Sequence, residues 1–287
     1  MTNFSDRLDS PIESAAKLIR SARGVLVAAG AGMGVDSGLP DFRGDQGFWH
    51  AYPALGRQGK SFADAATASQ FTRDPRTTWG FYGHRLALYR RTQPHAGFGI
   101  LRSWCDAAVS GGRVFTSNVD GQFQRAGFEA GQITERHGSI HWMQCSLPCD
   151  ESIWSAAPIV PDVDEEACKW RGGMPTCPSC GGIARPNVLM FNDPAWIPRR
   201  TDRQQDRLDE WLEVALLSVV VVEIGAGVAI PSVRSLSERI TRRGGNLVRI
   251  NPQDSRVRSG RVGTAVGLPM RALEALEAID QALRDRP

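Results

Sequence analysis

The sequence of 287 residues has little net charge, no long hydrophobic run and almost no lysine. Its 34 basic and 31 acidic residues leave a net charge of +3, which argues against nucleic acid as a ligand. The most apolar stretch, Val214 to Val222, is far shorter than the ~20 residues that span a bilayer, so we expect no membrane segment. The polar first residues lack the apolar core of a secretion signal, and we therefore expect a cytoplasmic protein.

Six cysteines are present, and five of them lie between residues 145 and 180. In a reducing compartment such a group more often binds a metal than forms disulfides. Cys177 and Cys180 are spaced as C-x-x-C, and Cys145 and Cys149 as C-x₃-C; thiolate pairs at such spacings can hold one tetrahedral Zn²⁺. A redox dithiol is the alternative interpretation of the C-x-x-C pair, and Cys168 competes for a ligand position. Four thiolates would leave no position for water, so this zinc would be structural.

Short apolar runs alternate with segments of helical periodicity, which predicts an α/β fold with a doubly wound, mostly parallel sheet. The expected strands are residues 25–29, 112–117, 132–137, 187–191, 218–224 and 246–250. The expected helices are residues 11–23, 98–108, 203–217, 232–243 and 269–284.

Two segments interrupt this alternation. Residues 48–93 are rich in aromatic side chains and helical in pattern, and residues 141–184 contain the cysteine pairs. We predict that both are insertions that form a smaller module. The sheet domain would then consist of residues 1–47, 94–140 and 185–287.

A glycine-rich turn follows the first expected strand, at Gly30, Ala31 and Gly32. Glycines at this place let the backbone approach a pyrophosphate. The G-x-G-x-x-G dinucleotide pattern is not completed, because Val35 stands where it needs glycine. A tight strand-to-helix turn without a ligand is therefore the alternative interpretation.

The residues that continue this turn make a more specific pattern, and four further stretches follow it along the chain. They are GAGMGVDSGLPDFRG at 30–44, TSNVDG at 116–121, HGS at 137–139, RPNVLMFND at 185–193, and Gly225–Pro231 with Ile250-Asn251. In this order they resemble the motifs of the sirtuins, the NAD-dependent protein deacylases, over about residues 11–280. The resemblance implies a Rossmann-like NAD-binding domain with an inserted zinc ribbon and helical module. It also places Cys145 where the first zinc ligand of the family lies.

The resemblance implies roles for individual residues. His137 would take a proton from a ribose hydroxyl of NAD⁺ as general base, and Asn118 would hold that ribose and a water. Asp120 would bind the nicotinamide carboxamide. The other implied cofactor-binding residues are Gly30, Ala31, Gly32, Asp41, Phe42, Arg43, Ser117, Gly225, Ala226, Gly227, Asn251 and Ala265. Taken alone, a single histidine is more often structural, and an Asn or Asp after a strand more often caps a turn.

The substrate implied by the resemblance is an acyl-lysine in a protein. Tyr82 and Arg85 form a Y-x-x-R pattern, which resembles the subclass that prefers malonyl, succinyl or glutaryl lysine. Arginine can bind a carboxylate through two N–H groups, and a tyrosine hydroxyl can add a third donor; an ordinary solvated helix face is the alternative.

Several positions depart from the sirtuin pattern: Ser117 replaces the usual Gln of its motif, and Gly34 stands where the glycine-rich loop usually has Ser. Phe191, Asn192 and Asp193 stand in the segment that would pair with the substrate peptide, where the family has F-G-E. Ala226 and Gly227 replace the Thr and Ser of the G-T-S motif, so the side-chain hydrogen bonds of that motif are missing.

The leading hypothesis is therefore an NAD⁺-dependent deacylase that releases nicotinamide and O-acyl-ADP-ribose, acting as a monomer. The altered substrate segment motivates a second hypothesis, an ADP-ribosyltransferase or an NAD⁺ hydrolase. A non-catalytic NAD or ADP-ribose sensor is the third.

Overall fold

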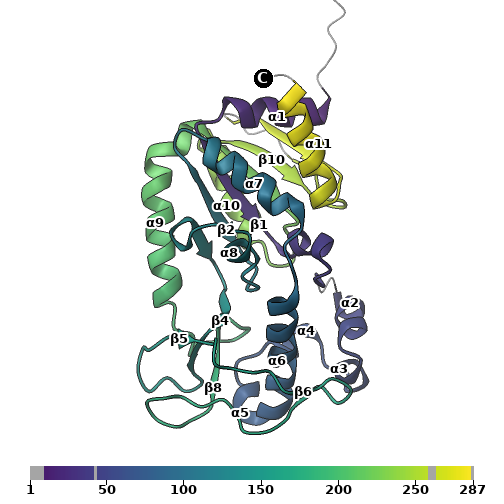
Figure 1. Ribbon diagram of the computed structural model, residues 1–287, viewed down its shortest axis with the longest axis vertical. Helices are drawn as coiled ribbons and strands as arrows, with labels where there is room; N and C mark the ends of the chain where they lie inside the picture. Colours follow the sequence, from purple (N-terminus) through teal and green to yellow (C-terminus); the bar gives the residue numbers. More distant parts are fainter. Residues whose placement is uncertain (1–9, 42–43, 258–262, 286–287) are drawn as a thin grey trace, which may run out of the picture. The chain divides into compact units, whose positions relative to one another are not determined.

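The computed structural model describes residues 10–41, 44–257 and 263–285 (Figure 1). Its internal contacts divide the chain into two compact units. The first unit comprises residues 1–36, 95–115 and 210–287, and the second comprises residues 37–94 and 116–209. The predicted division into a sheet domain and two insertions stays a prediction.

Six strands form one sheet, in the order β11-β10-β9-β1-β2-β3. Its strands are β1 (Gly24–Ala29), β2 (Gly112–Thr116), β3 (Ile133–Glu135), β9 (Val219–Ile224), β10 (Asn246–Ile250) and β11 (Ala265–Leu268). Strand β1 pairs in parallel with β9, β9 with β10, and β10 with β11. Every residue of β1 and β9 is buried, as expected for central strands of a sheet that is covered on both faces.

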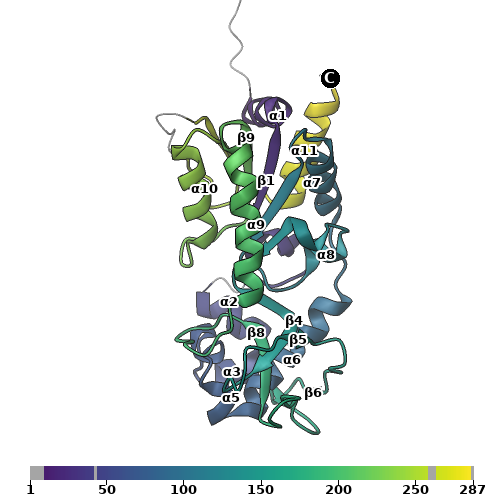
Figure 2. The same ribbon diagram turned by 90° about the vertical axis from the view of Figure 1, so that its left-hand side faces the viewer.

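Helices cover both faces of this sheet in the first unit. Helix α10 (Ser232–Arg242) lies on one face, and α7 (Ala96–Ala107) and α11 (Ala272–Asp285) lie on the other (Figure 2). Helix α1 (Pro11–Ser21) packs beside α11 and starts with a capping box, in which Ser10 and Glu13 exchange side-chain and backbone hydrogen bonds. This arrangement confirms the predicted doubly wound α/β fold.

The second unit combines short helices with small antiparallel sheets. One sheet has the order β5-β4-β8, and β6 pairs with β7. The strands are β4 (Gly138–Cys145), β5 (Trp154–Ser155), β6 (Val163–Asp164), β7 (Lys169–Trp170) and β8 (Ala184–Val188). The helices are α2 (Gly44–Ala51), α3 (Pro53–Arg57), α4 (Phe62–Ala65), α5 (Gln70–Arg73), α6 (Pro75–Arg91) and α8 (Gln122–Arg125), and α9 (Arg199–Ala215) begins in this unit. Its core is aromatic and includes Phe48, Phe71, Trp79 and Phe81.

One expected strand belongs to a different sheet from the one predicted. Residues 187–191 were expected in the parallel sheet, but the strand there is β8, which ends at Val188 and pairs antiparallel with β4. An apolar run shows that a segment is buried, but it does not show which strand lies beside it. Strands β4 and β11 were not predicted, because β4 mixes polar and apolar residues and β11 is only four residues long.

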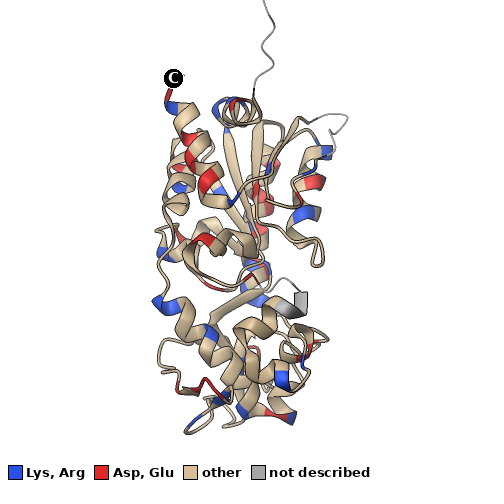
Figure 3. Cartoon of the chain, turned by 90° about the vertical axis from the view of Figure 1, so that its right-hand side faces the viewer, with Lys and Arg blue, Asp and Glu red and all other residues tan. Residues whose placement is uncertain are grey.

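Charged residues of both signs are interspersed along the elements of both units (Figure 3). Within the described residues, no helix has the length and apolar content needed to cross a membrane.

Candidate functional site

The sheet order places a ligand-binding position at the carboxyl ends of β1 and β9. From β1 the chain continues to β2 on one side, whereas β9 is followed by β10 and β11 on the other. Open parallel sheets bind ligands beyond the carboxyl ends of their strands, where the order reverses in this way. In the first unit the turns at this position are Gly30–Gly32 after β1 and Gly225–Gly227 after β9.

These two turns lie in direct backbone contact. The N–H of Gly30 donates to the carbonyl of Ile224 at 2.9 Å, and the N–H of Gly32 donates to the carbonyl of Gly225 at 3.1 Å. A Cβ on Gly225 would lie 2.4 Å from the Cα of Gly32, and Gly225 has a φ of +59°. The close approach and the positive φ both require glycine. This contact between the two turns explains the glycines structurally, and nucleotide binding by the turns stays a prediction.

Asn251 follows β10 at the same edge of the sheet. Its buried side chain donates from Nδ2 to the carbonyl of Ala226 at 3.0 Å, and its Oδ1 accepts from the N–H groups of Gln253 and Asp254. Asn251 thus joins the loop after β10 to the turn after β9. The structure does not bring Ala265 to this edge, because Ala265 pairs with Leu247, four residues before Asn251.

His95 is a residue of the first unit that the sequence did not single out. Its Nε2 donates to the carbonyl of Met33 at 2.9 Å, and its Nδ1 accepts from the N–H of Gly97 at 3.1 Å. It therefore caps α7 and also holds the 3₁₀ helix Ala31–Ser37 that contains Ala31 and Gly32. A histidine just before an apolar helix is the signal that could have indicated the cap.

In the second unit, the segment after β2 carries Ser117, Asn118 and Asp120. The N–H of Asn118 donates to Thr116 Oγ1 at 3.0 Å, and Asp120 Oδ1 accepts from the N–H of Gln122 at 2.9 Å. Asp120 is only 8% exposed. Burial raises the pKa of Asp120 to about 6, the Gln122 N–H opposes that shift, and the nearby charge of Glu135 adds to it.

His137 lies immediately before β4, half-buried, and is joined to this segment. Burial lowers the pKa of His137 below its usual value, the charge of Arg136 lowers it further, and a hydrogen bond to the Ser117 backbone opposes them. This direction favours the neutral imidazole, which is the form that can accept a proton. The next residue, Gly138, has a φ of +75°, and a Cβ there would lie 2.1 Å from the carbonyl oxygen of Asn187. The strand pairing of β4 and β8 thus requires glycine directly after the histidine.

Tyr82 and Arg85 are both buried on α6, at 1% and 7% exposure, so the solvated helix face expected as the alternative is wrong. Arg85 donates from Nε and Nη2 to the hydroxyl of Tyr89, at 2.9 and 2.8 Å. Its guanidinium also lies 5.2, 5.8 and 5.4 Å from the ring centroids of Phe81, Tyr82 and Tyr89. Tyr89 was not singled out in the sequence, although its position four residues after Arg85 would have placed it on the same face.

The segment that was predicted to pair with the substrate peptide is held by a buried ion pair. Arg185 donates from Nη2 and Nη1 to the two carboxylate oxygens of Asp193, at 2.7 and 2.8 Å, and these side chains are 1% and 0% exposed. Asp193 therefore fixes the loop, whereas Phe191 and Asn192 are its exposed residues. Asn192 has a φ of +49°, a conformation that asparagine tolerates better than most residues. Phe191 donates its N–H to the carbonyl of Ala66 at 3.0 Å.

The four predicted zinc ligands come together in the second unit. The sulfur atoms of Cys145, Cys149, Cys177 and Cys180 all lie within 4.8 Å of one another. The Sγ–Sγ distances between Cys145 and Cys180 and between Cys149 and Cys177 are 3.7 Å. A disulfide would need about 2.05 Å, whereas a tetrahedron with Zn–S bonds of ~2.3 Å has edges of about 3.8 Å. The donor set and its spacing thus fit Zn²⁺. Cys168 is buried elsewhere, among the residues of the aromatic core.

Of the remaining predicted site residues, Asp41 is half-buried in the second unit. Phe42 and Arg43 lie outside the described residues.

Comparison with known proteins decides the family. Residues 30–219, well over half of the chain, match the model of the Sir2 family. The chain belongs to the Sir2 family. Two similar Sir2 proteins are the NAD-dependent protein deacylase of Aeropyrum pernix, 29% identical over 93% of this chain and 96% of the relative, and NAD-dependent protein deacylase 2 of Pyrobaculum aerophilum, 32% identical over 84% and 85%.

Solved structures confirm the Sir2 fold. A Sir2 homologue in complex with NAD superposes with a TM-score of 0.73, at 23% identity and with 95% of this chain and 94% of that chain covered. A Sir2 homologue mutant in complex with ADP-ribose superposes with a TM-score of 0.72 at 24% identity, with 97% of each chain covered. The resemblance to sirtuins and the predicted fold class are therefore confirmed.

Proposed function

We propose that this Sir2 protein is an NAD⁺-dependent protein-lysine deacylase. The chain belongs to the Sir2 family, and relatives named NAD-dependent protein deacylase and deacetylase align with most of its length, which supports this activity. The observation that carries the proposal within this chain is His137, neutral, half-buried and hydrogen-bonded to the backbone segment that holds Asn118 and Asp120. A proton acceptor beside an amide and a buried carboxyl group suits a reaction on a sugar hydroxyl.

NAD⁺ supplies a ribose carbon that bears a good leaving group, nicotinamide. His137 accepts the proton of a ribose hydroxyl and so makes that oxygen a better nucleophile. Asn118 orients the same sugar through its side-chain amide. Asp120, whose pKa is raised to about 6, would still be mostly ionised at pH 7, so its carboxylate could accept a hydrogen bond from the NH₂ of the nicotinamide carboxamide. The acyl-lysine amide, NAD⁺ and one water would together give nicotinamide, free lysine and O-acyl-ADP-ribose: the bond from the ribose carbon to nicotinamide breaks, the acyl group passes from the lysine nitrogen to the sugar, and the water supplies the remaining oxygen and protons.

Nucleotide binding in the first unit is assigned to the backbone of Gly30, Ala31 and Gly32 and to Gly225, Ala226 and Gly227, with Asn251 as the polar side chain. The support for this is the position of both turns at the carboxyl ends of β1 and β9. Asp41, Phe42, Arg43 and Ser117 complete the proposed set, and Ala265 belongs to it only through the resemblance.

The acyl group that we propose carries a carboxylate, as malonyl, succinyl and glutaryl groups do. Arg85 is a buried cation whose planar orientation is fixed by Tyr89, and Tyr82 is buried on the same helix face. A guanidinium of fixed orientation can bind a carboxylate through two parallel hydrogen bonds, and a low-polarity aromatic setting strengthens them. The substrate peptide would be held by Phe191, Asn192 and Asp193, or by a loop whose shape these residues determine.

The four cysteines would hold one structural Zn²⁺, which ties β4 to the loop of Cys177 and Cys180. Because thiolates of this kind survive in a reducing compartment, we place the protein in the cytoplasm. The interspersed charge of both signs supports small-molecule and protein substrates over nucleic acid (Figure 3). We propose that the monomer is active.

The test is incubation of the zinc-loaded chain with NAD⁺ and a panel of acetyl-, succinyl- and glutaryl-lysine peptides, read by mass spectrometry. O-acyl-ADP-ribose formed in equal amount to deacylated peptide supports the proposal. The variant His137→Ala should lose this product by at least about a hundredfold, whereas the exposed His50→Ala should not. Free ADP-ribose formed without peptide would instead identify an NAD⁺ hydrolase, and nicotinamide release equal in wild type and His137→Ala would refute the role of His137.

A further inference from the structure

The turn after β9 has no polar side chain. Gly225, Ala226 and Gly227 can offer a ligand only their backbone groups. The directions of these groups depend on what fixes the carbonyl of Ala226, because a peptide plane turns as a unit. The side chains that bind the Ala226 carbonyl therefore set the orientation of this peptide plane.

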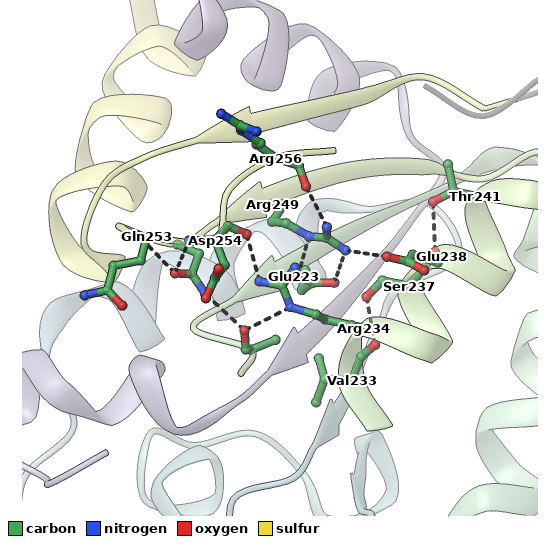
Figure 4. Close-up of polar contacts among 12 residues, drawn as sticks. Glu223, Val233, Arg234, Ser237, Glu238, Thr241, Arg249, Gln253, Asp254 and Arg256 are labelled. Atoms are coloured by element: carbon green, nitrogen blue, oxygen red, sulfur yellow. Dashed lines mark hydrogen bonds and ion pairs between the residues drawn. The ribbon is translucent and has the colours of Figure 1, made fainter. Parts of the chain in front are cut away.

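Arg234, on the first turn of α10, binds this carbonyl. Its Nε donates to the Ala226 carbonyl at 3.2 Å, and its Nη2 donates to the Asp254 carbonyl at 2.7 Å (Figure 4). One planar guanidinium thus joins two loops that are far apart in sequence, the turn after β9 and the loop after β10. Since the guanidinium is rigid, it fixes the distance between the two carbonyls.

The same carbonyl is held from the opposite loop. Asn251 Nδ2 donates to the Ala226 carbonyl at 3.0 Å, while Asn251 Oδ1 accepts from the N–H groups of Gln253 and Asp254. A carbonyl oxygen accepts two hydrogen bonds, so Arg234 and Asn251 together satisfy it. Arg234 also donates to the carbonyl of Asp254, and the N–H of Asp254 donates to Asn251. Ala226, Arg234, Asp254 and Asn251 are therefore joined in a closed ring of hydrogen bonds.

A second arginine anchors the far end of the loop after β10. Arg249, 4% exposed at its side chain, pairs with Glu223 at 2.6 Å and Glu238 at 3.3 Å, and its Nη1 donates to the Arg256 carbonyl at 2.8 Å. Arg249 and Arg234 differ in the charge of the groups that they bind. Arg249 neutralises a buried carboxylate, so its removal would damage the core. The protein acceptors of Arg234 are neutral carbonyls, so its removal leaves no carboxylate without its partner.

We propose that Arg234 is a positioning residue for the adenosine-diphosphate part of NAD⁺, acting through the turn at 225–227 and the loop at 251–254. The inference rests on the proposed function, which places the nucleotide at this edge of the sheet. Arg234 sets the backbone that replaces the missing side-chain hydroxyls of the turn. It acts on ground-state and transition-state binding alike, so its loss raises the KM for NAD⁺ and leaves kcat nearly unchanged.

The test measures binding of ADP-ribose, which lacks nicotinamide, by titration calorimetry with wild type, Arg234→Ala and Arg234→Lys. The matched control is Arg239→Ala, because Arg239 is an exposed arginine of the same helix. We expect Arg234→Ala to weaken ADP-ribose binding and to raise the KM for NAD⁺ each by about tenfold, the loss of two charge-assisted hydrogen bonds. Arg234→Lys keeps the charge but not the planar arrangement of donors, so its affinity should fall between those of wild type and Arg234→Ala, and Arg239→Ala should match wild type.

The inference is overturned if Arg234→Ala binds ADP-ribose as tightly as wild type, if Arg239→Ala weakens binding equally, or if kcat falls while KM stays constant. If Arg234→Ala does not fold, Arg234→Lys decides, and wild-type affinity in that variant overturns the inference. A wild-type chain that neither binds ADP-ribose nor releases nicotinamide would refute the proposed function itself, which is a separate result.

Discussion

Replacing Asp193 by asparagine should destabilise the protein severely while preserving the shape of the side chain. The carboxylate receives two hydrogen bonds from Arg185, at 2.7 and 2.8 Å, and one from the N–H of Met190 at 3.2 Å. Both charged side chains are essentially inaccessible to water. Asparagine can keep one hydrogen bond but leaves the Arg185 cation buried without its counter-charge, which typically costs about 3–5 kcal/mol. For a chain of this size that corresponds to a fall in Tm of roughly 10 °C.

The assay is thermal and urea unfolding followed by circular dichroism, with Asp164→Asn as the matched control. Asp164 lies 3.2 Å from Arg171 in the same unit, but these side chains are 37% and 59% exposed. An exposed pair contributes less than about 1 kcal/mol, so the control should lose little stability. A double variant with Arg185→Met and Asp193→Leu removes both charges and should recover most of the loss, since apolar replacement of a whole buried pair is often neutral.

Two results would contradict this reasoning. Asp193→Asn could unfold within about 1 kcal/mol of wild type, which would show that the buried cation finds solvent or another partner. Alternatively, Asp164→Asn could destabilise the protein as much as Asp193→Asn does, which would show that burial does not control the effect.

Further predictions concern substrate choice, pH and metal. Arg85→Met should reduce desuccinylation at least about a hundredfold more than deacetylation, and Tyr89→Phe should reduce it by about tenfold; equal loss for both acyl groups would refute the carboxylate clamp. The lowered pKa of His137 should place the acid limb of the kcat/KM profile below pH 6.5, and a limb above it would refute a neutral base. The pKa of Asp120 is higher in the folded than in the unfolded protein, so the free energy of unfolding falls as the pH rises from about 4 to 6. Asp120→Asn should therefore raise the Tm at pH 8 but not at pH 4. Equal effects of the variant at both pH values would refute this prediction. One zinc per chain should be found by mass spectrometry, and Cys177→Ser should abolish it and destabilise the fold; full metal content in that variant would refute the site.

The site motifs that could be predicted are those whose chemistry is local. The two glycine turns each follow an apolar strand directly, so their place at a strand end is visible in the sequence. The two cysteine pairs were likewise predictable, because two cysteines three or four residues apart can bind the same metal ion. His137 is identified only by its motif, since a single histidine has no periodic pattern of its own.

Contacts between distant segments were not predictable. Nothing in the sequence indicates that Arg234 reaches Asp254, or that Asp193 turns inward to Arg185 instead of toward a substrate. Strand β8 shows the same limit, because its apolar residues are buried as expected but beside β4 instead of in the parallel sheet.

The sequence by itself determined the family, the alternation of strands and helices, and the residue types available for chemistry, because motifs and periodicity depend on neighbours along the chain. Only the tertiary structure decided which carbonyl each arginine binds, which aspartate is a structural partner and which glycines face another backbone. Those choices depend on distances between residues far apart in sequence, and these distances exist only once the core has packed.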